Sequence, residues 1–105
     1  MFVPLVEEGW LEHPVTLLTA QEYLAPVLAH DIDTLVLGCT HYPLLRPLLA
    51  GVAGDAVQLV DSAETTATQA GALLARLGLL NPGTAPPAHQ FYVTDVPQRF
   101  RAVGE

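Results

Sequence analysis

Short apolar runs alternate along the chain with longer stretches whose apolar positions recur at helical spacing. Residues 34–37, 57–60 and 91–94 carry apolar side chains on both faces, which predicts buried strands. Residues 2–6 predict a fourth strand, which Pro4 places at an edge. This alternation predicts an α/β fold class with a mostly parallel sheet, flanked by helices and covered on both faces.

Two of the predicted helices contain proline. Residues 19–22 have the spacing of a capping box and predict the start of one helix, within which Pro26 is expected to cause a kink or an early end. Pro43 suits the first turn of another helix, and Pro47 is expected to make that helix short or irregular.

The clearest helical pattern lies in the second half of the chain. It runs from Ser62, the expected N-cap, to Leu77, and Gly78 is expected to end it. Its alanines and leucines predict a narrow face for close packing on a sheet. Residues 81–88, rich in proline, predict a loop, and residues 95–98 predict the start of a last helix.

Composition narrows the classes of partner and the compartment. The chain has 105 residues, of which 50% are apolar, and a net charge of −7 with four basic residues, all arginine. This charge argues against binding to nucleic acid or to an anionic membrane, since both need a basic face. The apolar excess favours a surface that a partner covers. A single cysteine and the absence of a targeting or membrane-spanning pattern predict a cytoplasmic protein.

The candidate chemistry lies where a predicted strand ends. Gly38 follows the apolar run, Cys39, Thr40 and His41 occupy a turn, and Pro43 opens a helix. Open strand ends are where α/β proteins bind ligands. A thiol just before a helix N-terminus is expected to have a lowered pKa, and unpaired N–H groups there favour a carboxylate. His41 could stabilise the thiolate or act as a general acid, and Thr40 could donate its hydroxyl to a carboxylate.

Simpler interpretations stay open on the residues alone. A lone cysteine after a strand is more often a small buried apolar residue, and a lone histidine is more often structural. No metal site is expected, because Cys39 and His41 lack the paired spacing of metal ligands. Glu7 and Glu8 could both be solvated carboxylates, and this is the better interpretation for Glu8.

Four segments together resemble the aspartate/glutamate racemase superfamily, and within it glutamate racemase. Residues 33–45 are similar to the family's second catalytic cysteine motif, and His41 favours the glutamate enzyme because related aspartate racemases tend to carry a glutamate there. The other segments resemble the stretches before and after that motif and the family's last strand and helix: residues 2–9, residues 60–67, and residues 91–95 with Arg99 and Phe100.

The resemblance implies roles for individual residues in a reaction that needs no cofactor. Cys39 resembles the thiol that exchanges a proton with Cα on one face of glutamate. Thr40 and His41 resemble residues that hold the substrate, with His41 also assisting the thiol. Glu7 resembles a carboxylate near the active site, although Glu8 beside it leaves this assignment open.

The resemblance also implies that much of a racemase is missing. The family's other catalytic cysteine and a substrate-binding segment belong to an N-terminal portion that is absent here, so the expected partners are glutamate and that portion. Residues 1–61 would belong to the second lobe, and residues 62–105 would complete the first. Such a chain is expected to be inactive alone; whether it forms a homo-oligomer stays open. The alternatives are a non-catalytic acidic interaction domain of the same fold and a racemase for aspartate.

Overall fold

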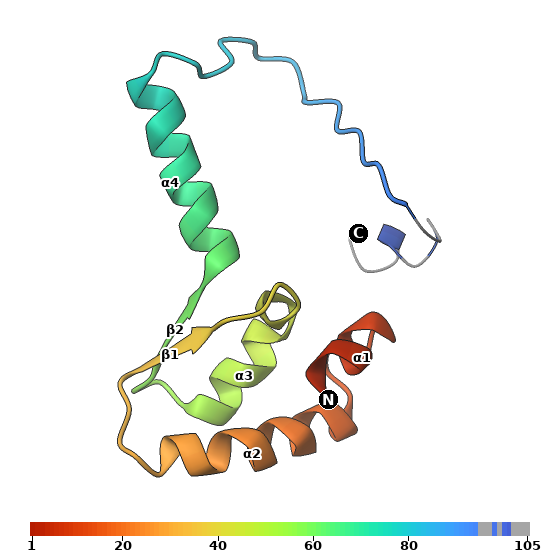
Figure 1. Cartoon of the computed structure of the whole chain (residues 1–105), viewed down its shortest axis with the longest axis vertical. Coiled ribbons are helices and arrows are strands. Elements are labelled where there is room, and N and C mark those ends of the chain that lie inside the picture. Colours follow the sequence, from red (N-terminus) through yellow and green to blue (C-terminus); the bar gives the residue numbers. More distant parts are fainter. Residues whose placement is uncertain (95–97, 99, 102–105) are drawn as a thin grey trace.

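The computed structural model describes residues 1–94, 98, 100 and 101. Its elements, in chain order, are α1 (Phe2–Glu7), α2 (Pro14–Leu28), β1 (Thr34–Leu37), the 3₁₀ helix η1 (Tyr42–Leu45), α3 (Arg46–Ala53), β2 (Gln58–Asp61) and α4 (Ser62–Arg76). Figure 1 shows α1, α2, α3 and the two strands gathered in one body from which α4 projects.

The two strands form a parallel pair, with Leu37 opposite Asp61 at their carboxyl ends. A parallel pair needs a crossover connection, which η1 and α3 supply. The α/β class and the parallel sheet are therefore confirmed, although the sheet of the described residues has two strands. Pro43 and Pro47 act as expected, since the crossover begins as a 3₁₀ helix and continues as a short α-helix.

The core lies between the helices and one face of the sheet. Leu45 and Leu49 on the crossover are almost completely buried, at 0% and 1% exposure. Around them cluster apolar side chains from α1, α2 and both strands: Phe2, Val6, Ala20, Leu24, Leu37 and Leu59. The other face of the sheet is open, because Val36 is 69% exposed. The expectation of a sheet covered on both faces is therefore wrong for this chain.

Two predicted strands are absent from the structure. Residues 2–6 lie in α1, where Phe2, Leu5 and Val6 share the buried face at helical spacing. Pro4 fits this short helix because it lies in the first turn, where its missing N–H removes no intrahelical bond. Residues 91–94 form no strand, and the two described strands pair only with each other. The helix expected from residue 95 falls largely outside the described residues.

The second helix begins earlier than the capping box at residues 19–22 predicts. Its N-cap is His13, whose Nδ1 accepts the N–H of Val15 at 3.2 Å, and Pro14 occupies its first turn. The ring of Trp10 stacks on that of His13, with centroids 4.2 Å apart. Pro26 does not end the helix, which continues to Leu28.

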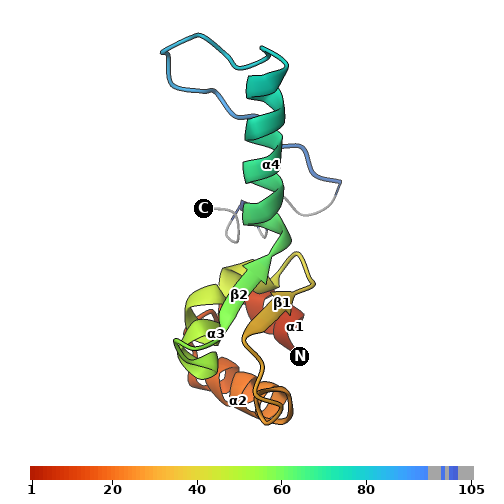
Figure 2. The same cartoon turned by 90° about the vertical axis from the view of Figure 1, so that its left-hand side faces the viewer.

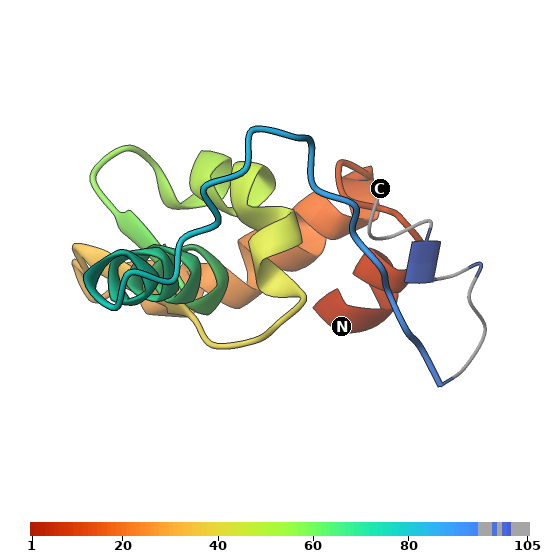
Figure 3. The same ribbon diagram turned by 90° about the horizontal axis from the view of Figure 1, so that it is seen from above.

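Helix α4 stands away from the rest of the molecule, as Figures 1 and 2 show. None of its residues is buried, so the predicted packing of its apolar face on the sheet is wrong in this chain. Figure 3, seen from above, shows the loop segment after α4 returning toward the side where α1 lies. The Cα radius of gyration is 17.1 Å, against about 13 Å for a compact domain of this length.

The ends of α4 agree with the prediction to within one residue. The N-cap is Asp61, not Ser62, and the helix ends at Arg76 with Gly78 beyond it at φ 66°. Glycine adopts this left-handed backbone conformation without the steric cost that a side chain brings.

Candidate active site

The candidate site lies at the carboxyl end of β1, in the turn of residues 38–41 that leads into η1, called the cysteine turn below. Cys39 is a free cysteine that is partly buried. The turn forms because β1 ends at Leu37 and the crossover must return over the sheet, so the side chains after the strand lie at its open end.

His41 is held by contacts at both of its ring nitrogens. Its Nε2 lies 3.4 Å from Oε1 of Glu7, and its Nδ1 lies 3.3 Å from the hydroxyl oxygen of Thr40. The contact with Glu7 is an ion pair when the ring is protonated. At Nδ1 the ring tautomer sets the direction of the hydrogen bond: a protonated Nδ1 donates to the hydroxyl oxygen of Thr40, and an unprotonated Nδ1 accepts the hydroxyl. The His41 side chain is 30% exposed and that of Glu7 is 53% exposed, so this pair is accessible to solvent.

The four residues selected from the sequence therefore fall into one region. Glu7 comes from the last turn of α1, and Thr40 and His41 come from the same turn as Cys39. Packing brings α1 there, because the ring of its Phe2 meets that of Tyr42 edge to face, with centroids 5.4 Å apart. A thiol, a hydroxyl, an imidazole and a carboxylate at one strand end can bind a small polar molecule and transfer protons.

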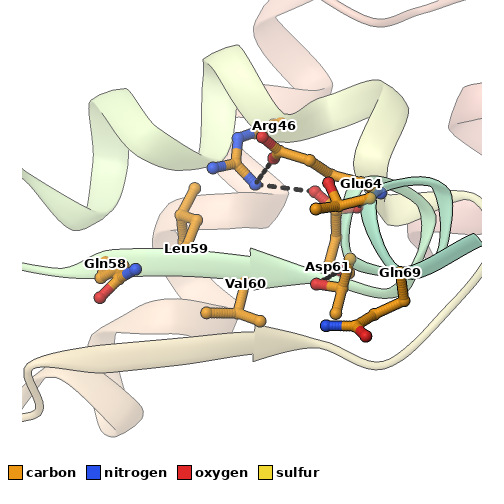
Figure 4. A pocket seen from close by; sticks show the side chains of 9 residues that line it. Arg46, Gln58, Leu59, Val60, Asp61, Glu64 and Gln69 are labelled. Atoms are coloured by element: carbon orange, nitrogen blue, oxygen red, sulfur yellow. Dashed lines mark hydrogen bonds and ion pairs between the residues drawn. The ribbon is translucent and has the colours of Figure 1, made fainter. Parts of the chain in front are cut away.

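A second polar cluster lies at the start of α4, and Figure 4 shows its residues. Arg46 donates from Nη1 to Oδ2 of Asp61 at 2.7 Å and also lies 3.7 Å from Oε2 of Glu64. Asp61 accepts the backbone N–H of Glu64 at Oδ1, and its backbone oxygen accepts the hydroxyl of Thr65. The sequence analysis named Ser62 as the N-cap and assigned no role to Asp61 or Arg46, because Arg46 lies too far from Asp61 along the chain for a local spacing signal.

The pKa of Asp61 is held below its ordinary value of 3.8. The largest cause is the hydrogen bond from the N–H of Glu64, which stabilises the charged carboxylate. Burial opposes this effect, while the hydrogen bond and the positive charge of Arg46 add to it. Asp61 is consequently a carboxylate at neutral pH.

An open hollow of about 360 Å³ lies beside this cluster, lined by Arg46, Asp61, Glu64 and residues of β2 and α4. It contains no residue of the cysteine turn, so it is separate from the candidate site. Among the described residues, no group of three or more His, Cys, Asp and Glu side chains could hold a metal ion. No helix in the described part of the chain is long and apolar enough to span a bilayer.

Several curated proteins to which this chain is similar are glutamate racemases. Glutamate racemase from Syntrophus aciditrophicus is 65% identical over all 105 residues, which cover 39% of the relative. The crystal structure of glutamate racemase from Francisella tularensis in complex with D-glutamate matches 99% of this chain and 39% of that one, with 38% identity and a TM-score of 0.79.

A glutamate racemase isoform from Bacillus anthracis matches 97% of this chain and 38% of its own, with 32% identity and a TM-score of 0.83. No family model matches the sequence. The chain spans about two fifths of the length of the curated relatives it matches. The chain is therefore homologous along its whole length to glutamate racemases and corresponds to part of such an enzyme.

Proposed function

We propose that this chain supplies one half of the proton-transfer machinery of a cofactor-independent glutamate racemase. The observation that carries the proposal is that Cys39 follows an open strand end, in the same turn as a histidine that contacts Glu7 and Thr40, in a chain homologous to glutamate racemases. The product of the complete enzyme would be D-glutamate for peptidoglycan.

The chemistry requires two groups on opposite faces of the substrate. To invert Cα without a cofactor, one base removes the proton from one face and a second group returns a proton to the other. We assign Cys39 to one face, with its thiolate removing the proton or its thiol returning one, according to the direction of the reaction. Cys39 is the single cysteine of this chain, and we assign the second group to the rest of a racemase.

The remaining site residues would bind substrate and orient the proton transfer. Thr40 would donate its hydroxyl to a substrate carboxylate, and His41 would hold the substrate and assist the thiol. Glu7 would keep the imidazole in one orientation through its contact with Nε2. Fixed donors of this kind stabilise the charge that develops on the substrate carboxylate when Cα loses its proton.

Exposed apolar surface supports a two-lobe arrangement in which residues 1–61 belong to one lobe and residues 62–105 complete the other. Val36 on the open face of the sheet is 69% exposed, and Leu73 and Leu77 on α4 are 45% and 57% exposed. The remaining three fifths of a racemase would cover such surfaces. On this proposal the isolated chain does not racemise glutamate.

The test is to combine the chain with the stretch of the Syntrophus relative that it does not cover, and to measure both racemisation and deuterium uptake at Cα. The assembled pair should racemise glutamate, and Cys39→Ser should abolish this. L- and D-glutamate offered separately should then differ, because one remaining base exchanges one enantiomer. His41→Gln should slow the reaction, whereas His30→Gln is the matched control.

Two outcomes would contradict the proposal. One is a correctly assembled pair without racemisation, which would favour a non-catalytic acidic interaction domain. The other is preferential turnover of aspartate in competition with glutamate, which would keep the reaction type and change the substrate.

A further inference from the structure

Both ends of the segment that carries Cys39 lie beside one residue, Asp61. On the N-terminal side, Leu37 is the register partner of Asp61 at the end of the parallel sheet, two positions before Cys39. On the C-terminal side, Arg46 opens α3 and donates to the Asp61 carboxylate at 2.7 Å. The segment between Leu37 and Arg46 contains the cysteine turn and η1.

The carboxylate of Asp61 is suited to this task because its two oxygens have different partners. Oδ1 accepts the N–H of Glu64 and caps α4, whereas Oδ2 accepts from Arg46. The Asp61 side chain is only 4% exposed, so its position is fixed by packing as well as by these bonds. Glu64 is a weaker partner of Arg46, since its side chain is 73% exposed and its oxygen lies 3.7 Å away.

Apolar burial alone does not determine how this segment is oriented. Leu45 and Leu49 anchor η1 and α3 in the core, but hydrophobic burial is non-directional. A short, charge-assisted hydrogen bond to a buried carboxylate adds the missing direction. The bond joins the first turn of α3 to the carboxyl end of β2. Helix α3 begins directly after the segment that carries Cys39, Thr40 and His41.

We propose that Arg46 and Asp61 form a positioning pair that sets the place of the Cys39 thiol relative to the sheet edge. The importance of this position for catalysis rests on the proposed racemase function, whereas the positioning itself does not. The pair touches no substrate in this proposal and acts through the main chain of the turn. This role is distinct from the capping of α4, because the cap requires Asp61 but does not require Arg46.

The test uses the rate at which iodoacetamide alkylates the chain, because Cys39 is its single cysteine. Arg46→Met removes the cation, and Asp61→Asn weakens the pair while keeping an oxygen that caps α4 well. Both variants should raise the alkylation rate by about threefold or more, since the turn then opens more often. Circular dichroism checks that each variant keeps its helices.

Two matched variants separate positioning from a general loss of structure. Arg46→Lys should restore the rate of the unaltered chain, because Arg46 meets both carboxylates through the single atom Nη1, which one ammonium can replace. Glu64→Gln removes only the weaker, exposed contact and should leave the rate unchanged. If the Arg46→Met variant does not fold, the alkylation rate of the Asp61→Asn variant provides the test of the positioning pair.

Unchanged alkylation in folded Arg46→Met or Asp61→Asn would overturn the positioning pair, as would failure of Arg46→Lys to restore the rate. The alkylation rates do not depend on whether the chain takes part in racemisation. Raised alkylation in a chain that never yields a racemising pair would refute the proposed function and leave the positioning pair standing.

Discussion

Nε2 of His41 lies 3.4 Å from Oε1 of Glu7, so the first helix of the chain contacts the turn that carries Cys39. This contact gives α1 a role besides its contribution to the core. It also joins a carboxylate and an imidazole that sequence spacing alone could not bring together.

We predict that Glu7→Gln slows the reaction of the assembled racemase far more than it destabilises the chain. Loss of this solvent-accessible pair should change the free energy of unfolding by less than about 1 kcal/mol. Deuterium uptake at Cα should fall by about tenfold, mainly in kcat, because His41 loses its fixed orientation. Denaturant unfolding and exchange kinetics measure the two effects. A larger kinetic effect of Glu8→Gln would transfer the role to Glu8.

The buried leucine of η1 provides a stability prediction with its own neighbour as control. Leu45→Ala should lower the free energy of unfolding by about 2–5 kcal/mol, because it leaves a cavity in the core. Leu44→Ala removes the same atoms from a side chain that is 38% exposed, and its effect should be much smaller. Urea titrations followed by circular dichroism compare them. Equal losses would mean that η1 presents a different face to the core.

The lowered pKa of Asp61 leads us to predict that the free energy of unfolding decreases in acid. Its pKa in the folded chain lies below the ordinary value of 3.8, so its contribution is fully present above that value. The contribution is lost as the pH falls through the lowered pKa, when the carboxylate takes up a proton. Urea midpoints measured from about pH 6 downward should therefore show an acid-dependent component that is missing in Asp61→Asn. An identical pH profile in both proteins would contradict this prediction.

The apolar side of α4 should matter for assembly and not for the stability of the isolated chain. Leu73→Gln should change the unfolding free energy by no more than about 0.5 kcal/mol, since Leu73 is 45% exposed. The same substitution should weaken binding of the rest of a racemase by tenfold or more, about 1.4 kcal/mol, measured by calorimetry. Thr68→Gln, on another side of the helix, is the control. Equal affinities would show that the apolar side of α4 is not covered on assembly.

Residue patterns predicted the parts of the fold that depend on local signals. Gly78 ends α4 as expected, and the paired prolines Pro43 and Pro47 give an irregular crossover. The capping-box spacing at residues 19–22 placed the start of α2 too late, because the helix begins at Pro14 with His13 as its N-cap. Pro4 is compatible with both an edge strand and the first turn of a helix. The helix forms because it places Phe2, Leu5 and Val6 on one buried face.

The remaining errors concern apolar segments that the described residues leave exposed. Residues 91–94 have the composition of a strand, but a strand needs a neighbour to accept its hydrogen bonds. Leu73 and Val36 are apolar, as buried residues usually are, yet they are 45% and 69% exposed. The candidate site was predictable as a set of residues because Cys39, Thr40 and His41 adjoin a strand end. The contacts to Glu7 and the bond from Arg46 to Asp61 depend on packing between distant segments.

Asp61 is both the last residue of β2 and the N-cap of α4, so strand and helix join without a linker. A helix turns by about 100° per residue. Inserting one residue at this junction would thus rotate the leucines of α4 by more than a quarter turn around the helix axis. The number of residues between β2 and α4 therefore sets the direction, around the helix axis, in which the apolar side of α4 faces.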